Sequence, residues 1–130
     1  MSALPTLTPT VQSRIVPIFS GGGTRLSAHI GIISALQDMT IGFDTLVGVS
    51  GGSIIASLYA KGYSVSEMRE LALLTDFKQF TDFSLIRLLR EGGLSSGDVF
   101  QKWIDAQLEG ATFEDLSLDL HILATDVNGG

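Results

Sequence analysis

Hydrophobic residues along the chain fall into short, strand-like runs and longer, helix-like runs that follow one another. Residues 15–19 and 43–49 are short apolar runs, and residues 118–125 alternate between apolar and polar positions, as strands do. Residues 26–39 place apolar side chains at helical spacing, and residues 53–60 form an apolar run of helix length. The order strand, helix, strand, helix predicts parallel strands joined by crossover helices.

Two more helices and one ambiguous segment are predicted downstream. Ser64 and Glu67 have the spacing of a capping box, and residues 95–98 look like the cap of a further helix. Between these helices, residues 77–89 are densely apolar. Ordinary core packing is the favoured interpretation of this segment, and a lid, a substrate-side wall or a membrane-contacting patch are the alternatives. In the first strand, Pro17 removes one ladder donor, so that strand is predicted to be irregular or exposed there.

The composition of the chain limits which functions are possible. The 130 residues suffice for one domain with a real core, and 45% of them are hydrophobic. Eight Lys and Arg residues against 14 Asp and Glu residues give a net charge of −6, which disfavours nucleic acid as a partner. The chain has no cysteine and 2 histidines, so we expect no disulfide, no metal site and no cofactor.

The two ends of the chain differ from the part between them. Residues 1–14 read as a short polar leader without the features of a signal peptide, and no run reaches membrane-spanning length. The predicted location is therefore cytoplasmic, with peripheral contact at membranes as an extension of it. The domain is predicted over residues 15–130. Because residues 126–130 form a turn signature with nothing after it, we expect this domain to be cut short.

A glycine-flanked serine lies between the second strand and the second helix. Gly48, Ser50 and Gly51-Gly52 have the pattern of a nucleophile elbow, in which a sharp turn tolerates little bulk and makes the central hydroxyl project. Backbone N–H groups at the start of the next helix then lie where a developing oxyanion needs donors. A plain Gly/Ser-rich turn between buried elements is the alternative.

A second glycine loop, Gly21, Gly22 and Gly23 followed by Arg25, links the first strand to the first helix. A dinucleotide-binding fingerprint fails because Leu26 stands where a third glycine is needed, and a P-loop fails for want of Gly-Lys-Ser/Thr. A tight turn without a ligand stays open as an interpretation. An oxyanion hole fits best, because both loops follow parallel strands and therefore open at the same edge of the sheet.

With both loops placed, the chain resembles the patatin-like phospholipases, a family of serine acyl hydrolases. The similar stretches are residues 20–25, 28–31, 48–52, 92–94 and 123–126. The resemblance implies a three-layer α/β/α fold with a mainly parallel sheet, truncated at its C-terminus. It also implies a lipid acyl ester hydrolase of the phospholipase A or lysophospholipase type, acting on phospholipid or another acyl-lipid. In this scheme Ser50 is the nucleophile, and Gly21, Gly22, Gly23 and Arg25 form or support the oxyanion hole.

Two positions depart from the family pattern. Leu26 replaces the last glycine of the oxyanion loop, which changes the start of the following helix. The chain also contains no Asp-Gly pair, whereas the second member of the family's Ser-Asp dyad is the aspartate of an Asp-Gly motif. Asp126 aligns with the strand-end aspartate and not with that dyad member. We therefore expect the dyad aspartate to lie beyond the chain end, and the 130-residue chain to be inactive alone.

Three other functions remain as alternatives. A Ser-His-Asp esterase would use Ser50, Asp98 or Asp115, and His121, in the chain order of the α/β-hydrolases. An acyltransferase shares the Gly-x-Ser-x-Gly elbow but lacks a second motif here. An inert fragment or an interaction scaffold would use neither loop.

Overall fold

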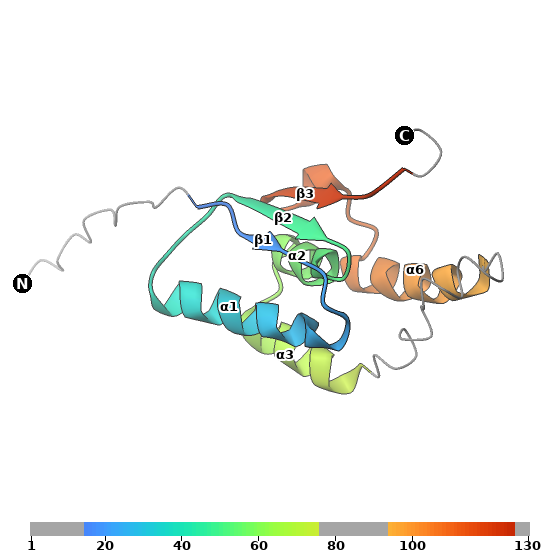
Figure 1. Cartoon of the computed structure of the whole chain (residues 1–130), viewed down its shortest axis with the longest axis horizontal. Coiled ribbons are helices and arrows are strands. Elements are labelled where there is room, and N and C mark those ends of the chain that lie inside the picture. The colour runs from blue at the N-terminus through green and yellow to red at the C-terminus, as the bar shows by residue number, and fades with distance from the viewer. Residues whose placement is uncertain (1–14, 76–93, 127–130) are drawn as a thin grey trace, which may run out of the picture.

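The computed structural model describes residues 15–75 and 94–126, without the side chains of residues 23, 24 and 94–98. Along these residues, an α-helix follows each of the first two strands, and two further α-helices precede the third strand (Figure 1). The elements are, in order, β1 (Ile18–Phe19), η1 (Gly23–Leu26), α1 (Ser27–Asp38), β2 (Thr45–Val49), α2 (Gly52–Lys61), α3 (Val65–Leu74), α6 (Leu94–Leu108), η2 (Phe113–Asp115) and β3 (Asp119–Leu123). The predicted segments 1–14 and 77–89 lie outside the described residues.

The strands form a parallel sheet in the order β1-β2-β3. Val47 at the middle of β2 pairs with Ile18 on one side and His121 on the other. Parallel neighbours require crossover connections, and α1 and α2 lie within the two that join these strands. The predicted α/β class with a parallel sheet is therefore confirmed.

One face of the sheet carries the hydrophobic core. Phe19, Leu46 and Leu120 come from the three strands and share this face, where α1 and α2 both pack against it. The buried core residues are Phe19, Leu26, Ile30, Ile33, Leu46, Ile55, Ala56, Leu58, Ala60, Met68 and Leu120. Burial of apolar side chains from strands and helices in a single cluster is the main stabilisation of these elements.

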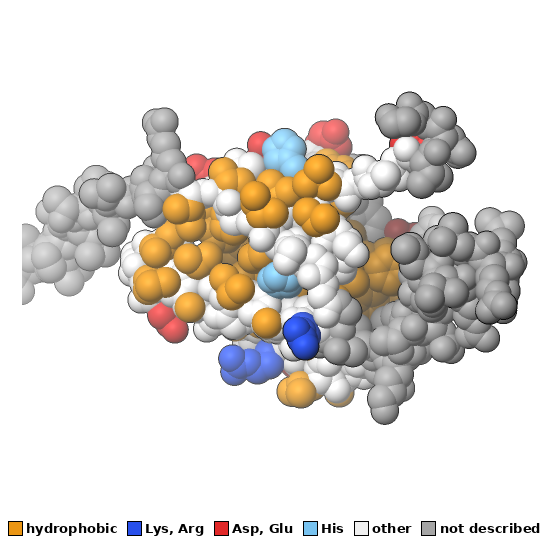
Figure 2. Space-filling model, viewed as in Figure 1, with side chains coloured by type: hydrophobic (Ala, Val, Ile, Leu, Met, Phe, Trp, Pro, Cys, Tyr) orange, Lys and Arg blue, Asp and Glu red, His pale blue; other side chains and the backbone are white. Residues whose placement is uncertain are grey.

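The opposite face of the sheet is apolar and open. Ile18 and Leu123 point to it, and their side chains are 65% and 58% exposed. Hydrophobic side chains gather over the strands and α1 on the side of the molecule drawn in Figure 2. In the part of the chain that the structure describes, helices thus cover one face of the sheet more fully than the other.

Two element starts differ from the sequence prediction. β1 begins only after Pro17, because proline has no N–H for the ladder, although the Pro17 carbonyl still accepts a hydrogen bond from the Val47 N–H at 3.0 Å. β1 is also an edge strand of this sheet, where such a residue is tolerated. α6 begins at Leu94, so the predicted cap at residues 95–98 lies inside the helix, and that boundary was wrong.

The C-terminal end of α2 is fixed by a turn and a capping box. Gly62 ends α2 in the left-handed region with a φ of +111°, as its sequence position predicts. Ser64 and Glu67 then form the predicted capping box of α3, with the Ser64 N–H donating to the Glu67 carboxylate at 2.7 Å. This backbone hydrogen bond, followed by the one from the Ser64 side chain, lowers the pKa of Glu67.

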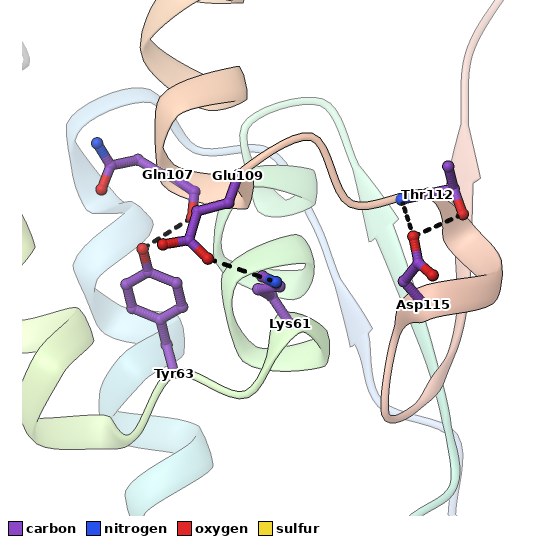
Figure 3. A network of polar contacts seen from close by, with 6 residues as sticks. All are labelled: Lys61, Tyr63, Gln107, Glu109, Thr112 and Asp115. Carbon is purple, nitrogen blue, oxygen red and sulfur yellow. Dashed lines mark hydrogen bonds and ion pairs between the residues drawn. The ribbon is translucent and has the colours of Figure 1, made fainter.

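Polar contacts join this end of α2 to the end of α6 (Figure 3). The Tyr63 hydroxyl donates to the Gln107 carbonyl oxygen at 2.8 Å, and Lys61 Nζ lies 3.8 Å from a carboxylate oxygen of Glu109. Burial, followed by the charge of Glu109, raises the pKa of Tyr63. These residues also line an open cavity of about 300 Å³, which lies at the far end of α2 from Ser50.

Candidate active site

Ser50 lies at the carboxyl end of β2, one residue before the N-cap of α2. Its φ is +53°, a left-handed conformation that costs a non-glycine residue on the order of 1–3 kcal/mol. The other described non-glycine residues with positive φ, Thr40 and Glu109, follow helix ends, where this conformation is an ordinary way to stop a helix. Ser50 instead precedes a helix and is exposed, which are the properties of a nucleophile elbow.

The glycines around Ser50 let backbone segments come into direct contact. A Cβ on Gly48 would lie 2.6 Å from the Ser53 Cα, and one on Gly52 would overlap the Phe19 carbonyl oxygen. Real Cβ atoms do not approach other atoms so closely, so any larger residue would push β1, β2 and α2 apart. Gly48 and Gly52 are therefore required by the packing of the strands on α2.

The structure brings the two glycine loops together. A Cβ on Gly21 would lie 3.0 Å from the Ser50 Cβ and 3.2 Å from the Ser50 Oγ. A Cβ on Gly22 would meet only the Cβ of Arg25, at an ordinary contact distance of 3.6 Å. Gly21 thus leaves space directly beside the serine hydroxyl, whereas packing gives no reason for glycine at position 22.

Helices that begin at this edge have no side-chain cap. The N-cap residues of η1, α1 and α2 are Gly22, Leu26 and Gly51, and none of them accepts a hydrogen bond with its side chain. The first N–H groups of a helix have no partner within the helix and carry a partial positive charge. Gly23, the first residue of η1, belongs to the same stretch of backbone. This edge can therefore offer N–H donors to an anionic group.

Leu26, which departs from the family pattern, is a core residue of this site. Its side chain is 7% exposed, and its Cδ2 atom lies 2.8 Å from the position that a Cβ on Gly51 would occupy. Leu26 therefore packs directly on the turn that follows Ser50. The helical spacing of Leu26 with Ile30 and Ile33 was the sequence signal for this burial.

Arg25 is exposed, and its side chain has no hydrogen bond or ion pair with the described residues. Its backbone N–H donates to the Gly22 carbonyl oxygen at 3.1 Å, which closes the first turn of η1. The structure thus places the Arg25 backbone in the glycine loop and leaves the guanidinium in solvent.

His29 is a residue of this edge to which the sequence analysis gave no role. Its Nε2 lies 2.8 Å from the Ser20 carbonyl oxygen, and its ring stacks on Phe19 with the ring centroids 4.8 Å apart. Its presence in the family-like stretch at residues 28–31 was a signal, but the sequence did not reveal its partners.

The residues of the Ser-His-Asp alternative are not assembled around Ser50. His121 pairs with Val47, which is three residues before Ser50, or roughly 10 Å back along the sheet at about 3.3 Å per residue. Its ring contacts the Asp119 carboxylate at 3.2 Å. Asp115 accepts hydrogen bonds from Thr112 in η2, ahead of the amino end of β3, and the side chain of Asp98 lies outside the described residues.

Comparison with known proteins agrees with the geometry of the two loops. The family model of patatin-like phospholipases matches residues 18–128. The chain belongs to the patatin-like phospholipase family. Both glycine loops, at residues 20–25 and 48–52, lie within the matched segment.

Several curated proteins are similar to this patatin-like chain. Neuropathy target esterase sws of Drosophila grimshawi is 30% identical over 112 residues, which cover 85% of the chain and 8% of that protein. Patatin-like phospholipase domain-containing protein 6 of Homo sapiens is 28% identical over 115 residues, which cover 87% of the chain and 8% of that protein. Lysophospholipase NTE1 of Yarrowia lipolytica is 50% identical over 48 residues, which cover 37% of the chain and 3% of that protein. The chain spans less than a tenth of the length of these relatives.

Neither a membrane-spanning helix nor a metal cluster occurs in the described part of this patatin-like chain. No helix there is long and apolar enough to cross a bilayer. Over the same residues, no group of three or more His, Cys, Asp and Glu side chains is arranged to hold a metal ion.

Proposed function

We propose that this chain supplies the nucleophile and the oxyanion hole of a serine-dependent lipid acyl ester hydrolase. The observation that carries the proposal is the contact between the two loops. Gly21 leaves a space at 3.2 Å from the Ser50 Oγ, on a serine held at a φ of +53°. A hydroxyl held in a strained turn beside uncapped helix starts is arranged for attack on an ester carbonyl.

In the proposed reaction, the Ser50 Oγ attacks the ester carbonyl carbon as its proton passes to a general base. Negative charge develops on the carbonyl oxygen, where N–H groups of Gly21, Gly22 and Gly23 and of the α2 start stabilise it. The C–O bond to the alcohol breaks, and the alcohol oxygen takes the proton from the base. Water then attacks the acyl-serine, and the base takes one proton of the water. The base passes this proton to the Ser50 Oγ as the C–O bond between the acyl carbon and Ser50 breaks, which releases the carboxylic acid.

The general base in this scheme is an aspartate of an Asp-Gly motif outside these 130 residues, because the chain contains no Asp-Gly pair. Together with Ser50 it forms a Ser-Asp dyad. The 130-residue chain should therefore hydrolyse esters weakly or not at all. Strong turnover by the purified chain, lost in Ser50→Ala, would show that a base within the chain serves instead.

The proposed substrates are phospholipids or other acyl-lipids, of which a lysophospholipid is one. The relatives include a lysophospholipase and a neuropathy target esterase, which supports an ester of this class. A substrate of this kind resides in or near membranes, so the proposal includes peripheral membrane contact from a cytoplasmic location. The net charge of −6 favours apolar contact over attraction to anionic lipid.

The test is a pair of substitutions at Ser50 in a protein that also carries the Asp-Gly motif. Both Ser50→Ala and Ser50→Gly should abolish hydrolysis of lysophospholipid and of p-nitrophenyl esters and prevent labelling by a fluorophosphonate probe. Ser50→Gly should in addition raise the free energy of unfolding by about 1 kcal/mol, because glycine adopts a positive φ without strain.

The matched control is Ser66→Ala, which removes an exposed hydroxyl on α3. It should keep the turnover and the labelling of the unsubstituted protein. Wild-type turnover in Ser50→Ala would exclude Ser50 as the nucleophile.

A further inference from the structure

His29 is connected to the oxyanion loop by two contacts from the first turns of α1. Its Nε2 lies 2.8 Å from the carbonyl oxygen of Ser20, the residue immediately before the three glycines. Its ring is half-buried and stacks on Phe19 with an interplanar angle of 21°. One imidazole therefore holds both residues that lead into the loop.

The partner of Nε2 determines the tautomer of this ring. A carbonyl oxygen accepts hydrogen bonds and cannot donate them, so Nε2 carries the proton of the 2.8 Å hydrogen bond. Nδ1 is buried and has no hydrogen-bond partner among the described residues. A proton on Nδ1 would be a buried donor without an acceptor, which is costly. Of the two neutral tautomers, the geometry thus favours the one with its proton on Nε2.

The hydrogen bond to Ser20 also fixes the direction of an N–H group in the loop. The Ser20 carbonyl and the Gly21 N–H belong to one planar trans peptide, in which they point in opposite directions. A donor that holds the carbonyl oxygen therefore sets the direction of the Gly21 N–H. Gly21 is the residue that lies beside the Ser50 hydroxyl.

The same peptide is limited on its other side by the first turn of α2. A Cβ on Gly52 would lie 2.6 Å from the Ser20 carbonyl oxygen and would overlap the Phe19 carbonyl. The Ser20 oxygen is thus held between the His29 ring and the start of α2. Rotation of the Ser20–Gly21 peptide would break the hydrogen bond to His29.

From these contacts we infer that His29 is a positioning residue for the oxyanion hole. By holding the Ser20 carbonyl oxygen, it orients the Gly21 N–H. The inference rests on the proposed function of the loop. His29 itself does not touch the reacting atoms. Its loss should therefore weaken transition-state stabilisation more than substrate binding.

The first test compares two substitutions of His29 in a protein with the Asp-Gly motif. His29→Phe keeps a ring to stack on Phe19 but removes the donor, and it should lower kcat about 10- to 100-fold with KM changed less than about 2-fold. This loss is smaller than the 10²–10³ expected on deleting a donor outright. His29→Gln restores an N–H donor and should recover a clear part of the lost kcat.

The control is His121→Phe, which removes the other histidine of the chain and should leave kcat unchanged. Wild-type kcat in His29→Phe, together with inactive Ser50→Ala, would overturn the positioning role and leave the proposed function intact. Wild-type turnover in Ser50→Ala would overturn the proposed function instead.

A second measurement does not depend on activity or on a folded His29 variant. Long-range ¹H–¹⁵N NMR correlations of the unsubstituted chain should show a proton on His29 Nε2. The same pattern should persist in Ser50→Ala. A ring that carries its proton on Nδ1 alone would contradict the hydrogen bond on which the inference is built.

Discussion

The two ends of α2 differ in whether side chains cap the helices that begin there. At the Ser50 end, the helices begin at Gly22, Leu26 and Gly51, and no side chain caps their first N–H groups. At the other end, α3 and η2 begin at Ser64 and Thr112, each with a capping box closed by a carboxylate three residues later. Capping groups contribute stability because they satisfy helix donors, whereas uncapped donors remain available for a ligand.

The same contrast appears in the backbone. The Ser50 end holds a serine in a left-handed conformation ahead of a helix, which costs stability. At the other end, Gly62 adopts its positive φ without that cost, and Glu109 adopts one where α6 ends, as residues that stop a helix often do. Substitutions at the Ser50 end should therefore separate activity from stability. Those at the capped end should change stability alone.

The largest effect is expected where a glycine of the Ser50 end is required by packing. Gly52→Ala places a Cβ on the Phe19 carbonyl oxygen and should lower the free energy of unfolding by about 3 kcal/mol or more. Thermal or urea unfolding of the chain measures this loss. Gly31→Ala is the matched control, because a Cβ there meets nothing within 4 Å, and it should stabilise α1 by about 1 kcal/mol. Equal stability of the two variants would refute the close packing at Gly52.

Gly22→Ala should affect activity and spare stability. A Cβ at this position meets only Arg25 at 3.6 Å, so the free energy of unfolding should change by less than about 0.5 kcal/mol. If the Gly22 N–H stabilises the oxyanion and the substitution displaces it, kcat should fall on the order of 10²–10³ with little change in KM. Steady-state kinetics on a lysophospholipid, in a protein with the Asp-Gly motif, provide the measurement.

Arg25→Ala is the companion variant and should lower kcat less, because the guanidinium makes no hydrogen bond or ion pair with the described residues. An unchanged kcat with a large rise in KM for Gly22→Ala would argue against the oxyanion role. Binding of ATP or NAD that is lost on the same substitution would assign the loop to phosphate binding.

A cap substitution should show the reverse behaviour. Ser64→Ala removes the hydroxyl that accepts from the Glu67 N–H at 3.2 Å, and it should lower the free energy of unfolding by about 1 kcal/mol. Turnover should stay at the wild-type level, since α3 begins at the far end of α2 from Ser50. Ser66→Ala, on the same helix but outside the cap, should change neither quantity. A fall in kcat for Ser64→Ala in the folded protein would show that the two ends are not independent.

The sequence predicted well the structural features that depend on residues close together in the chain. The capping box at Ser64 and the helix stop at Gly62 depend on residues within one turn, and both are present. The parallel β1-β2 pair follows from two apolar runs separated by one amphipathic helix. That topology alone was sufficient to expect Gly21 and Ser50 at the same edge of the sheet.

Contacts between segments distant in the sequence were harder to predict. Leu26 was noted as a departure, but its contact with Gly51 depends on how α1 packs beside α2. The bond of His29 to Ser20 depends on the path of the loop between them, which no periodicity encodes. The sequence did not predict the capping box at Thr112, because its aspartate at the N3 position is a less usual partner than glutamate.

The smallest expected effect is a pH dependence at the capped end. The pKa of Glu67 is lowered, first by the hydrogen bond from the Ser64 N–H and then by that from its hydroxyl, below the ordinary value of 4.5. A carboxylate whose pKa is lower in the folded state stabilises the fold above its unfolded pKa, and this contribution disappears as the pH falls through the folded pKa. Wild type should therefore exceed Glu67→Gln in free energy of unfolding at pH 7, and the difference should narrow below about pH 4.5.

Urea unfolding of both proteins between pH 7 and pH 3 measures this difference directly. Glu70→Gln is the matched control, because it removes another exposed carboxylate of α3 that makes no capping hydrogen bond. Asp115, whose pKa is lowered first by the backbone hydrogen bond from Thr112, is present in all three proteins and cancels from the comparison. A difference for Glu67→Gln that does not change with pH would mean that the ionised carboxylate does not strengthen the cap. The cap of α3 would then depend on the Ser64 hydroxyl rather than on the charge of Glu67.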